Sequence, residues 1–367
     1  MIRMRYYGFQ QVVLDPLIKT DGPCVILHRN NDPWFANIFR SVTNSIKELF
    51  YDKKYLFIIS IHDMWGEESQ YNRFIPYIKK YKELGYKIIL YNAEDLVRYL
   101  SLNDEITDDI KRYVDIISEI DVKKDYQKEY PPFKSSHYFD TWNNFYSVYA
   151  FTLYIHFCKS IGIDEWWDFG KENIDFIKKI VPNFNIPYKQ FIPATKKEVK
   201  FENKDISKIA FIGSNTEDFV YDKKDFNYDV DIKLKINRRS KLLTGLECDV
   251  YDYKNPVDLY DVANNYSTIL NIHSTAIRKI PEYIRIYDIL YNGLLPVVEA
   301  SLYDSYYSNS VVKFNESLST DTSKVKKELK EVLEKLKDET YYGQELERCI
   351  NSFNEENKKL VELYKDY

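Results

Sequence analysis

Hydrophobic and polar positions follow two different periods along the first third of the chain. Short runs rich in β-branched residues are followed by stretches in which apolar residues recur every three to four positions. These runs predict strands at 24–29, 54–63 and 86–92, and helices at 34–50, 71–85 and 93–100. Strands that alternate with helices at this spacing predict a parallel sheet with helices on both faces.

The same alternation begins again after residue 208. It predicts strands at 208–214, 248–253, 266–273 and 294–299, and helices at 238–246, 257–265 and 281–293. Residues 104–180, between the two alternations, have a largely helical pattern. Residues 181–208 contain three prolines and a weak apolar pattern, which indicates a segment crossing between domains. The last stretch, 322–367, is charged and helical.

These patterns predict an α/β protein with two Rossmann-like domains and a C-terminal helical tail. The length of 367 residues suits two domains of ordinary size. We expect an N-terminal domain at 1–190 with a helical insertion at about 104–180, and a C-terminal domain at 205–321. The helices of 322–367 are expected to pack back across the domains.

Composition and charge narrow the class of protein. The formal net charge of −5 gives no support for a protein that coats nucleic acid, which is usually basic. The 4 cysteines show no metal-ligand spacing, which is typical of isolated thiols in a reducing compartment. The N-terminus lacks the apolar core of a signal peptide, and no apolar run is long enough to span a membrane. We therefore expect a cytoplasmic protein.

Charged residues recur at three-residue steps on the predicted helix 281–293. Glu282, Arg285 and Asp288 are its polar members, and these steps place them along one side. The preceding strand ends at Asn271 and His273, so its carboxyl end and the start of the helix meet at one sheet edge. Ligands bind at this edge in parallel sheets, and helix N-termini favour phosphate. The alternative is a solvated helix face that carries three charges.

The segment from Leu270 to Ser301 resembles the sugar-nucleotide segment of GT-B glycosyltransferases, especially the CgeB-like and related bacterial and viral branches. Those enzymes have a strand ending in Asn-x-His, then Glu-x-x-Arg-x-x-Glu, and then a strand ending in Pro-Val-Val-x-Glu. The residues of this sequence at the matching motif positions are Asn271, His273, Glu282, Arg285, Asp288, Gly293 and Glu299. The third acid of the helix is Asp rather than Glu.

Two further pieces resemble the same group. "IAFIGS" at 209–214 is similar to the strand and turn that open its C-terminal domain, and "NRRSKLLTGL" at 237–246 is similar to its next helix. The resemblance implies that Gly213 and Ser214 approach the donor. It also implies that Arg238 or Arg239 neutralises phosphate charge in forked geometry.

What the resemblance implies is transfer of a sugar from a nucleotide sugar, with a UDP-sugar expected, to a hydroxyl of a glycan or another acceptor. The acceptor would bind the N-terminal domain. No metal and no further cofactor is expected, because Arg, Lys and helix N-termini stabilise the leaving diphosphate. His62 and Asp63, at the end of the second predicted strand, are the candidates for the catalytic base. The alternative for Asp63 is a helix N-cap.

Three rival functions share this fold. A phage-type DNA-base glycosyltransferase would extract a base from the duplex, and lysine pairs at 53–54, 79–80 and 123–124 would contact phosphates. DNA therefore remains a possible partner, although solvated lysines are the usual explanation of such pairs. A non-catalytic nucleotide-sugar-binding protein could keep the same fold. A nucleotide-sugar epimerase would act without an acceptor.

Overall fold

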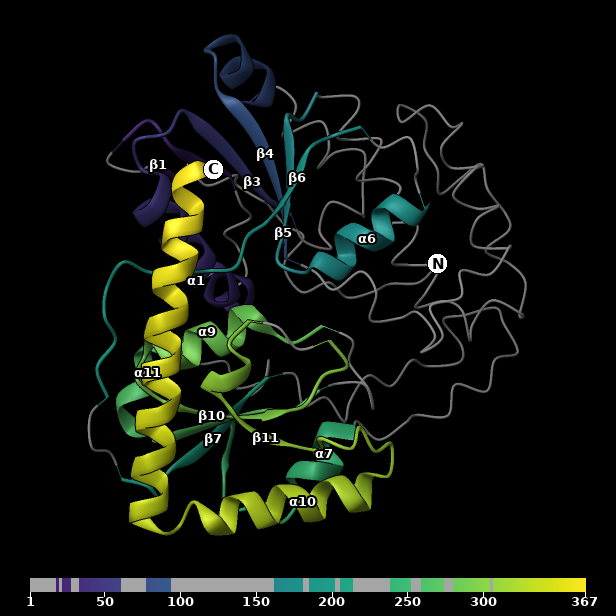
Figure 1. Ribbon diagram of the computed structural model, residues 1–367, viewed down its shortest axis with the longest axis vertical. Helices are drawn as coiled ribbons and strands as arrows, with labels where there is room; N and C mark the ends of the chain where they lie inside the picture. Colours follow the sequence, from purple (N-terminus) through teal and green to yellow (C-terminus); the bar gives the residue numbers. More distant parts are fainter. Residues whose placement is uncertain are drawn as a thin grey trace. The chain divides into compact units, whose positions relative to one another are not determined.

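The computed structural model describes the chain in several stretches, which fall into two compact units (Figure 1). The first unit takes the described residues up to Phe191 except 33–49, and the second takes 33–49 and the described residues from Ile192 onward. The described residues are 18–19, 22–27, 33–60, 77–93, 162–180, 185–201, 205–213, 238–251, 259–273, 280–303 and 306–367.

The first unit is built on a six-stranded sheet in the order β1-β2-β3-β4-β5-β6. Every neighbouring pair is parallel except β1 and β2, which are antiparallel. Five of the six residues of β4 are buried, as expected for a strand in the middle of a parallel sheet. The strands are β1 (Ile18–Lys19), β2 (Val25–Leu27), β3 (Tyr55–Ser60), β4 (Lys87–Asn92), β5 (Glu165–Asp168) and β6 (Tyr188–Gln190), and helix α6 (Lys171–Ile180) follows β5.

Aromatic rings form much of the core of this first unit. Phe50, Phe57, Trp167 and Phe191 are fully buried. The Trp167 ring lies 5.1 Å from the ring of Phe57 and 5.2 Å from that of Phe50, both edge-on. Such pairs contribute about 0.5–1.5 kcal/mol each beyond their buried area. The abundant aromatic residues of this chain therefore serve packing at this sheet.

The second unit contains a five-stranded sheet in the order β11-β10-β9-β7-β8, in which all neighbours are parallel. From β7 the chain crosses to β8 on one side, and it then returns past β7 to β9 and continues to β10 and β11. This is the order of a doubly wound sheet, with its reversal between β7 and β9. The strands are β7 (Ile209–Ile212), β8 (Asp249–Tyr251), β9 (Thr268–Asn271), β10 (Leu295–Glu299) and β11 (Val312–Phe314).

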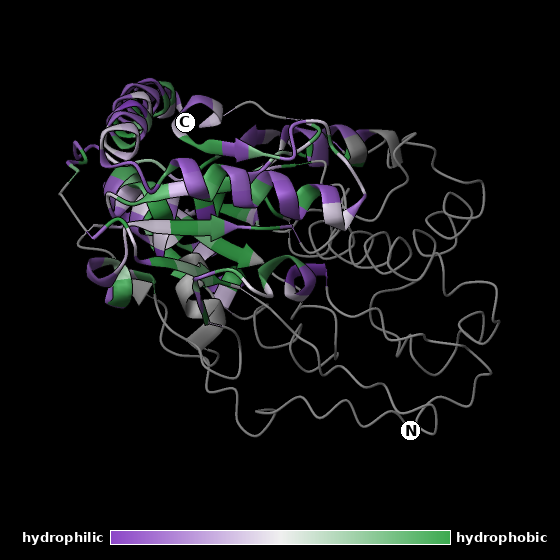
Figure 2. Cartoon of the chain, turned by 90° about the horizontal axis from the view of Figure 1, so that it is seen from below, coloured by the Kyte–Doolittle hydropathy of each residue, from purple (hydrophilic) through white to green (hydrophobic). Residues whose placement is uncertain are grey.

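Helices cover both faces of this second sheet. Helix α9 lies on one face, and α7 and α10 lie together on the other (Figure 1). Ile289 of α9 packs with Ala210, Ile269 and Ala263 in one buried cluster. Figure 2 shows apolar colour in the strands and polar colour on the outer sides of the helices. The helices are α7 (Arg238–Leu243), α8 (Leu259–Val262), α9 (Tyr283–Tyr291), α10 (Thr322–Lys335) and α11 (Glu339–Leu363), with a 3₁₀ turn at Ala263–Asn265 after α8.

The C-terminal helices begin at side-chain caps and confirm the predicted helical tail. Asp321 caps α10 by accepting from Ser323 N, and Asp338 caps α11 by accepting from Tyr341 N. Helix α11 is the long ribbon near the C-terminus in Figure 1, and it contacts α9 and β10. Among the described residues, no helix has the length and apolar character needed to cross a membrane.

Helix α1 (Pro33–Phe50) and helix α11 both bind the extended segment 192–199 within the second unit. Asn354 accepts from Val199 N and donates to Val199 O, at 2.9 and 2.8 Å. Further along, Ser45 Oγ accepts from Ala194 N at 3.1 Å. Side chains thus supply to this segment the hydrogen bonds that a neighbouring strand would otherwise supply.

The structure confirms the alternation of strands and helices and two mainly parallel sheets, and it corrects three points. Residues 104–180 were expected to be largely helical, but 165–168 form strand β5 beside β4. The crossing segment 181–208 contains β6, and the last strand, β11, was not predicted. Each of these strands has only three or four residues, too few to show a two-residue period. The neighbouring strands therefore determine their conformation.

Candidate functional site

The strand order of the second sheet reverses between β7 and β9. These two strands are neighbours, yet the chain leaves them toward opposite edges of the sheet. Gly213 follows β7 directly, and Asn271 is the last residue of β9. In doubly wound sheets ligands bind at this point, because the loops after the two strands diverge and leave room between them.

Asn271 carries a buried amide at this point. Its side chain is fully buried, and among the described residues neither Oδ1 nor Nδ2 has a hydrogen-bond partner. An unpaired buried polar group costs about 1–3 kcal/mol. Buried amides are paired in the great majority of cases, so this one points to a polar ligand.

Two guanidinium groups flank one carboxylate at the start of α9. Nη2 of Arg239 lies 3.6 Å from Oε1 of Glu282, and Nη1 of Arg285 lies 3.1 Å from Oε2. The three side chains are between 7% and 24% exposed, so solvent screens them only in part. Glu282 is the N-cap residue of α9, but its side chain makes no cap hydrogen bond. Glu282 thus pairs with two cations beside a helix N-terminus, a place that favours an anion.

The backbone and neighbouring rings hold these arginines in place. Nε of Arg239 donates to the Ile272 carbonyl at 2.7 Å, and its guanidinium lies 5.6 Å from the centre of the Phe211 ring. A Cβ on Gly213 would lie 3.2 Å from Nη1 of Arg285. The structure therefore brings together five of the predicted donor residues: Gly213, Arg239, Asn271, Glu282 and Arg285.

Arg238 is engaged differently from Arg239. Both of its terminal nitrogens donate to the carboxylate of Glu299, and the Nη1–Oε2 distance is 2.8 Å. Nη1 also donates to the His273 carbonyl at 3.2 Å. The ring of His273 is fully buried, with Nε2 3.1 Å from Oγ of Ser301. Arg238 and His273 thus lie at the same sheet edge, in contact with β10 and the residues that follow it.

Asp288 pairs with a tyrosine of the neighbouring helix α8. Its Oδ1 accepts from the hydroxyl of Tyr260 on α8 at 3.0 Å. Burial, with Asp288 beside it, raises the pKa of Tyr260 well above its ordinary value. Arg40 of α1 lies over the Tyr260 ring, 4.9 Å from its centre.

Other predicted site residues lie outside the described stretches. These are His62, Asp63 and Ser214. The sequence did not indicate three residues that hydrogen-bond to residues of this region: Asn315 with Glu299, Ser301 with His273, and Tyr260 with Asp288. Asn315 follows a strand that was not predicted, and Tyr260 lies in an ordinary helical pattern, so neither had a signal in the sequence.

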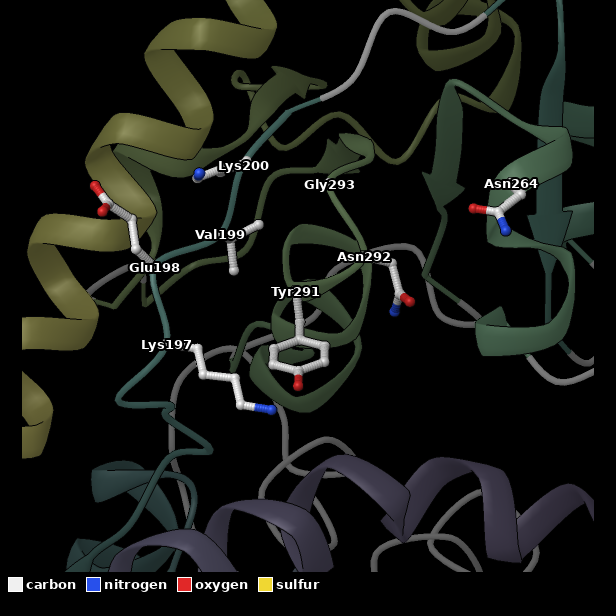
Figure 3. Close-up of a pocket in the computed structure, with 8 residues that line it drawn as sticks. All are labelled: Lys197, Glu198, Val199, Lys200, Asn264, Tyr291, Asn292 and Gly293. Carbon is white, nitrogen blue, oxygen red and sulfur yellow. The ribbon is translucent and has the colours of Figure 1, made fainter.

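A hollow lies at the C-terminal end of α9, around Tyr291 (Figure 3). Its volume is about 300 Å³. In Figure 3 the Lys197 side chain points toward the Tyr291 hydroxyl, whereas Glu198 points away from the hollow. None of the residues expected from the sequence to bind a donor lines it. Its lining residues are Lys197, Glu198, Val199, Lys200, Asn264, Tyr291, Asn292 and Gly293.

Comparisons with known proteins give faint likenesses only. No protein-family model matches the chain, and no curated protein matches it significantly. Among solved structures, T4 phage β-glucosyltransferase is 12% identical with a TM-score of 0.39, and covers 90% of this chain and 91% of its own. A glycosyltransferase from Rickettsia africae is 11% identical with a TM-score of 0.35, and covers 86% and 99%. A UDP-glucosyltransferase from Polygonum tinctorium is 8% identical with a TM-score of 0.28, and covers 89% and 79%. Likenesses at this level add no argument to those made from the residues.

Proposed function

We propose that this protein is a glycosyltransferase of the GT-B type, which moves a sugar from a nucleotide-sugar donor to an acceptor hydroxyl without a metal ion. The observation that carries the proposal is the group of Arg239, Arg285 and Asn271 at the strand-order reversal of the second sheet. The resemblance of residues 270–301 to the donor segment of GT-B enzymes supports the same assignment.

Arg239 and Arg285 would bind the diphosphate of the donor. Their guanidinium groups flank the carboxylate of Glu282. A diphosphate carries more charge than one carboxylate and has several oxygens for forked contacts. These cations would stabilise the negative charge that develops on the leaving diphosphate.

Asn271 and Glu282 would bind the neutral parts of the donor. The amide of Asn271 offers one acceptor and two donors to hydroxyl groups. Once phosphate meets the arginines, the carboxylate of Glu282 is available to accept from a ribose or sugar hydroxyl. In this proposal Asp288 reaches a ribose hydroxyl only by exchanging its present partner, the Tyr260 hydroxyl.

The acceptor would be deprotonated by a residue of the first unit. His62 and Asp63 remain the candidates, because they follow β3, and the carboxyl ends of parallel strands carry the ligand edge of a sheet. The base of the donor is proposed to be uracil, and its transferred sugar a hexose.

Donor turnover without acceptor tests the proposal. Full-length protein is incubated with UDP- and GDP-sugars, and the release of nucleoside diphosphate is followed by chromatography. We expect slow hydrolysis of at least one donor, with loss of this activity in Arg239→Gln. A matched control is Lys241→Gln, which removes a positive charge from the same helix beyond the two arginines. If no donor is hydrolysed and none raises the melting temperature, the proposal fails.

A further inference from the structure

The carboxylate of Glu299 accepts hydrogen bonds from three parts of the second unit. It is the last residue of β10 and is fully buried. Arg238 donates to both of its oxygens from the start of α7. The backbone N–H of His273, just after β9, donates at 3.1 Å, and Nδ2 of Asn315, just after β11, donates at 2.9 Å. One side chain thus joins the carboxyl ends of three neighbouring strands.

The turn after β9 is held from both sides by this arrangement. Arg239 binds the Ile272 carbonyl, Arg238 binds the His273 carbonyl, and Glu299 binds the His273 N–H. The two consecutive arginines of α7 therefore donate hydrogen bonds to the carbonyls of two consecutive residues, Ile272 and His273. Asn271, with its buried amide, directly precedes this turn, so its position depends on the same contacts.

Arg238 and Arg239 pair with different carboxylates, which separates their roles. Glu299 pairs with Arg238 in forked geometry, while Arg239 and Arg285 both pair with Glu282. A buried ion pair gives weak evidence of stabilisation, because desolvation offsets its attraction. What the pair does supply is a fixed geometry for α7 relative to the turn.

We infer that Glu299 is a positioning residue of the donor site. Through Arg238 and the His273 N–H, it fixes the distance between Arg239 and Asn271, which meet the diphosphate and a hydroxyl of the nucleotide sugar. The inference rests on the proposed function and deepens it. In this account Arg238 acts through Glu299 and does not meet the phosphate.

Nucleotide affinity and amide exchange test this role together. UDP binding to the full-length chain is measured by calorimetry for wild type, Glu299→Gln and Arg238→Lys. Exchange of the His273 amide is measured without ligand. Glu356→Gln is the matched control, because Glu356 is a partly buried carboxylate that accepts from the Tyr307 N–H in the same unit. Arg238→Lys keeps the positive charge but cannot make the forked pair of hydrogen bonds to Glu299. This variant tests the role if Glu299→Gln does not fold.

We expect both test variants to bind UDP at least about tenfold more weakly, which corresponds to about 1.4 kcal/mol. The His273 amide should exchange faster in Glu299→Gln, and Glu356→Gln should change neither quantity. Equal UDP affinity in wild type and both test variants overturns the positioning role and leaves the proposed function standing. Wild-type protein that binds neither UDP nor GDP overturns the proposed function, and the inference with it.

Discussion

Gly213 and Arg285 lie so close together that a Cβ on Gly213 would stand 3.2 Å from Nη1 of Arg285. The same Cβ would lie 2.7 Å from the ring of Phe211. A side chain at residue 213 would therefore crowd both the Phe211 ring and the Arg285 guanidinium.

Gly213→Ala is expected to displace the Arg285 guanidinium and to weaken binding of the nucleotide donor by about tenfold. The measurement is UDP titration calorimetry. Gly343→Ala is the control, because nothing lies within 4 Å of a Cβ at that helical position. It should leave UDP affinity unchanged and raise the unfolding free energy by about 0.5–1 kcal/mol. Full UDP affinity in Gly213→Ala would place Arg285 outside the site.

Arg285 is expected to serve binding more than stability. Arg285→Gln should lower UDP affinity by at least about tenfold and change the melting temperature little, because a partly exposed ion pair contributes about 0–1 kcal/mol. Arg348→Gln is the comparison, since Arg348 also pairs with a glutamate three residues earlier but in addition donates to two backbone carbonyls. It should lower the melting temperature and leave UDP affinity unchanged. The opposite pattern would make the Arg285 contact structural.

The buried amide of Asn271 is expected to lower the unfolding free energy and to strengthen binding of the UDP-sugar. Asn271→Leu replaces a buried unpaired amide with an apolar side chain of similar volume. It should raise the unfolding free energy by about 1 kcal/mol in the absence of ligand, and abolish detectable UDP-sugar binding. Urea unfolding and calorimetry measure the two effects. A less stable variant would show that the amide is hydrogen-bonded inside the folded protein.

The sequence predicted the elements that carry the site because continuous apolar runs mark the two strands and a three- to four-residue apolar period marks the helix. Helix α9 and the strands before and after it follow apolar patterns of ordinary length, and the charges at Glu282 and Arg285 stand out in that pattern. The place of Asn271 at a strand end follows from the same pattern. Parallel strands bring such ends to one edge, so the grouping of these residues was predictable.

The partners of these charges were not predictable. Arg238 pairs with Glu299, which is 61 residues away, because β9 and β10 are neighbours and both end at that edge. Nothing local distinguishes Arg238 from Arg239, yet one meets Glu299 and the other meets Glu282. The reversal of strand order was likewise not visible in the sequence, because strand order depends on which crossovers the chain makes.

Asn354 is expected to contribute to stability through segment 192–199. Asn354→Ala leaves both the N–H and the C=O of Val199 without their present partner, and should lower the unfolding free energy by about 2–3 kcal/mol. Chemical unfolding measures this loss. Asn351→Ala, at an exposed position of the same helix, is the control and should cost less than about 0.5 kcal/mol. A loss at Asn354 no greater than at Asn351 would contradict the contact.

Asp168 is expected to make the stability of the first unit depend on pH. Burial raises the pKa of Asp168 to about 7, against the four donors that lower it: Gly170 N, Asn92, Asn173 and Trp166. Between about pH 4 and pH 7 the folded chain then holds a proton that the unfolded chain has released. This group therefore makes the unfolding free energy fall as pH rises through that window.

The variant Asp168→Asn removes this titration. Its stability deficit relative to wild type should be larger at pH 5 than at pH 8, as measured by urea unfolding at both values. A deficit that is larger at pH 8 would show that the four donors hold the carboxylate in its charged form.

A crystal structure of the full-length protein with UDP tests the central claim most directly. We expect the diphosphate to lie between Arg239 and Arg285, at the carboxyl ends of β7 and β9, with Asn271 in contact with the nucleotide and Glu282 moved from between the arginines. A nucleotide bound elsewhere, such as in the hollow around Tyr291 at the other end of α9, would contradict the account.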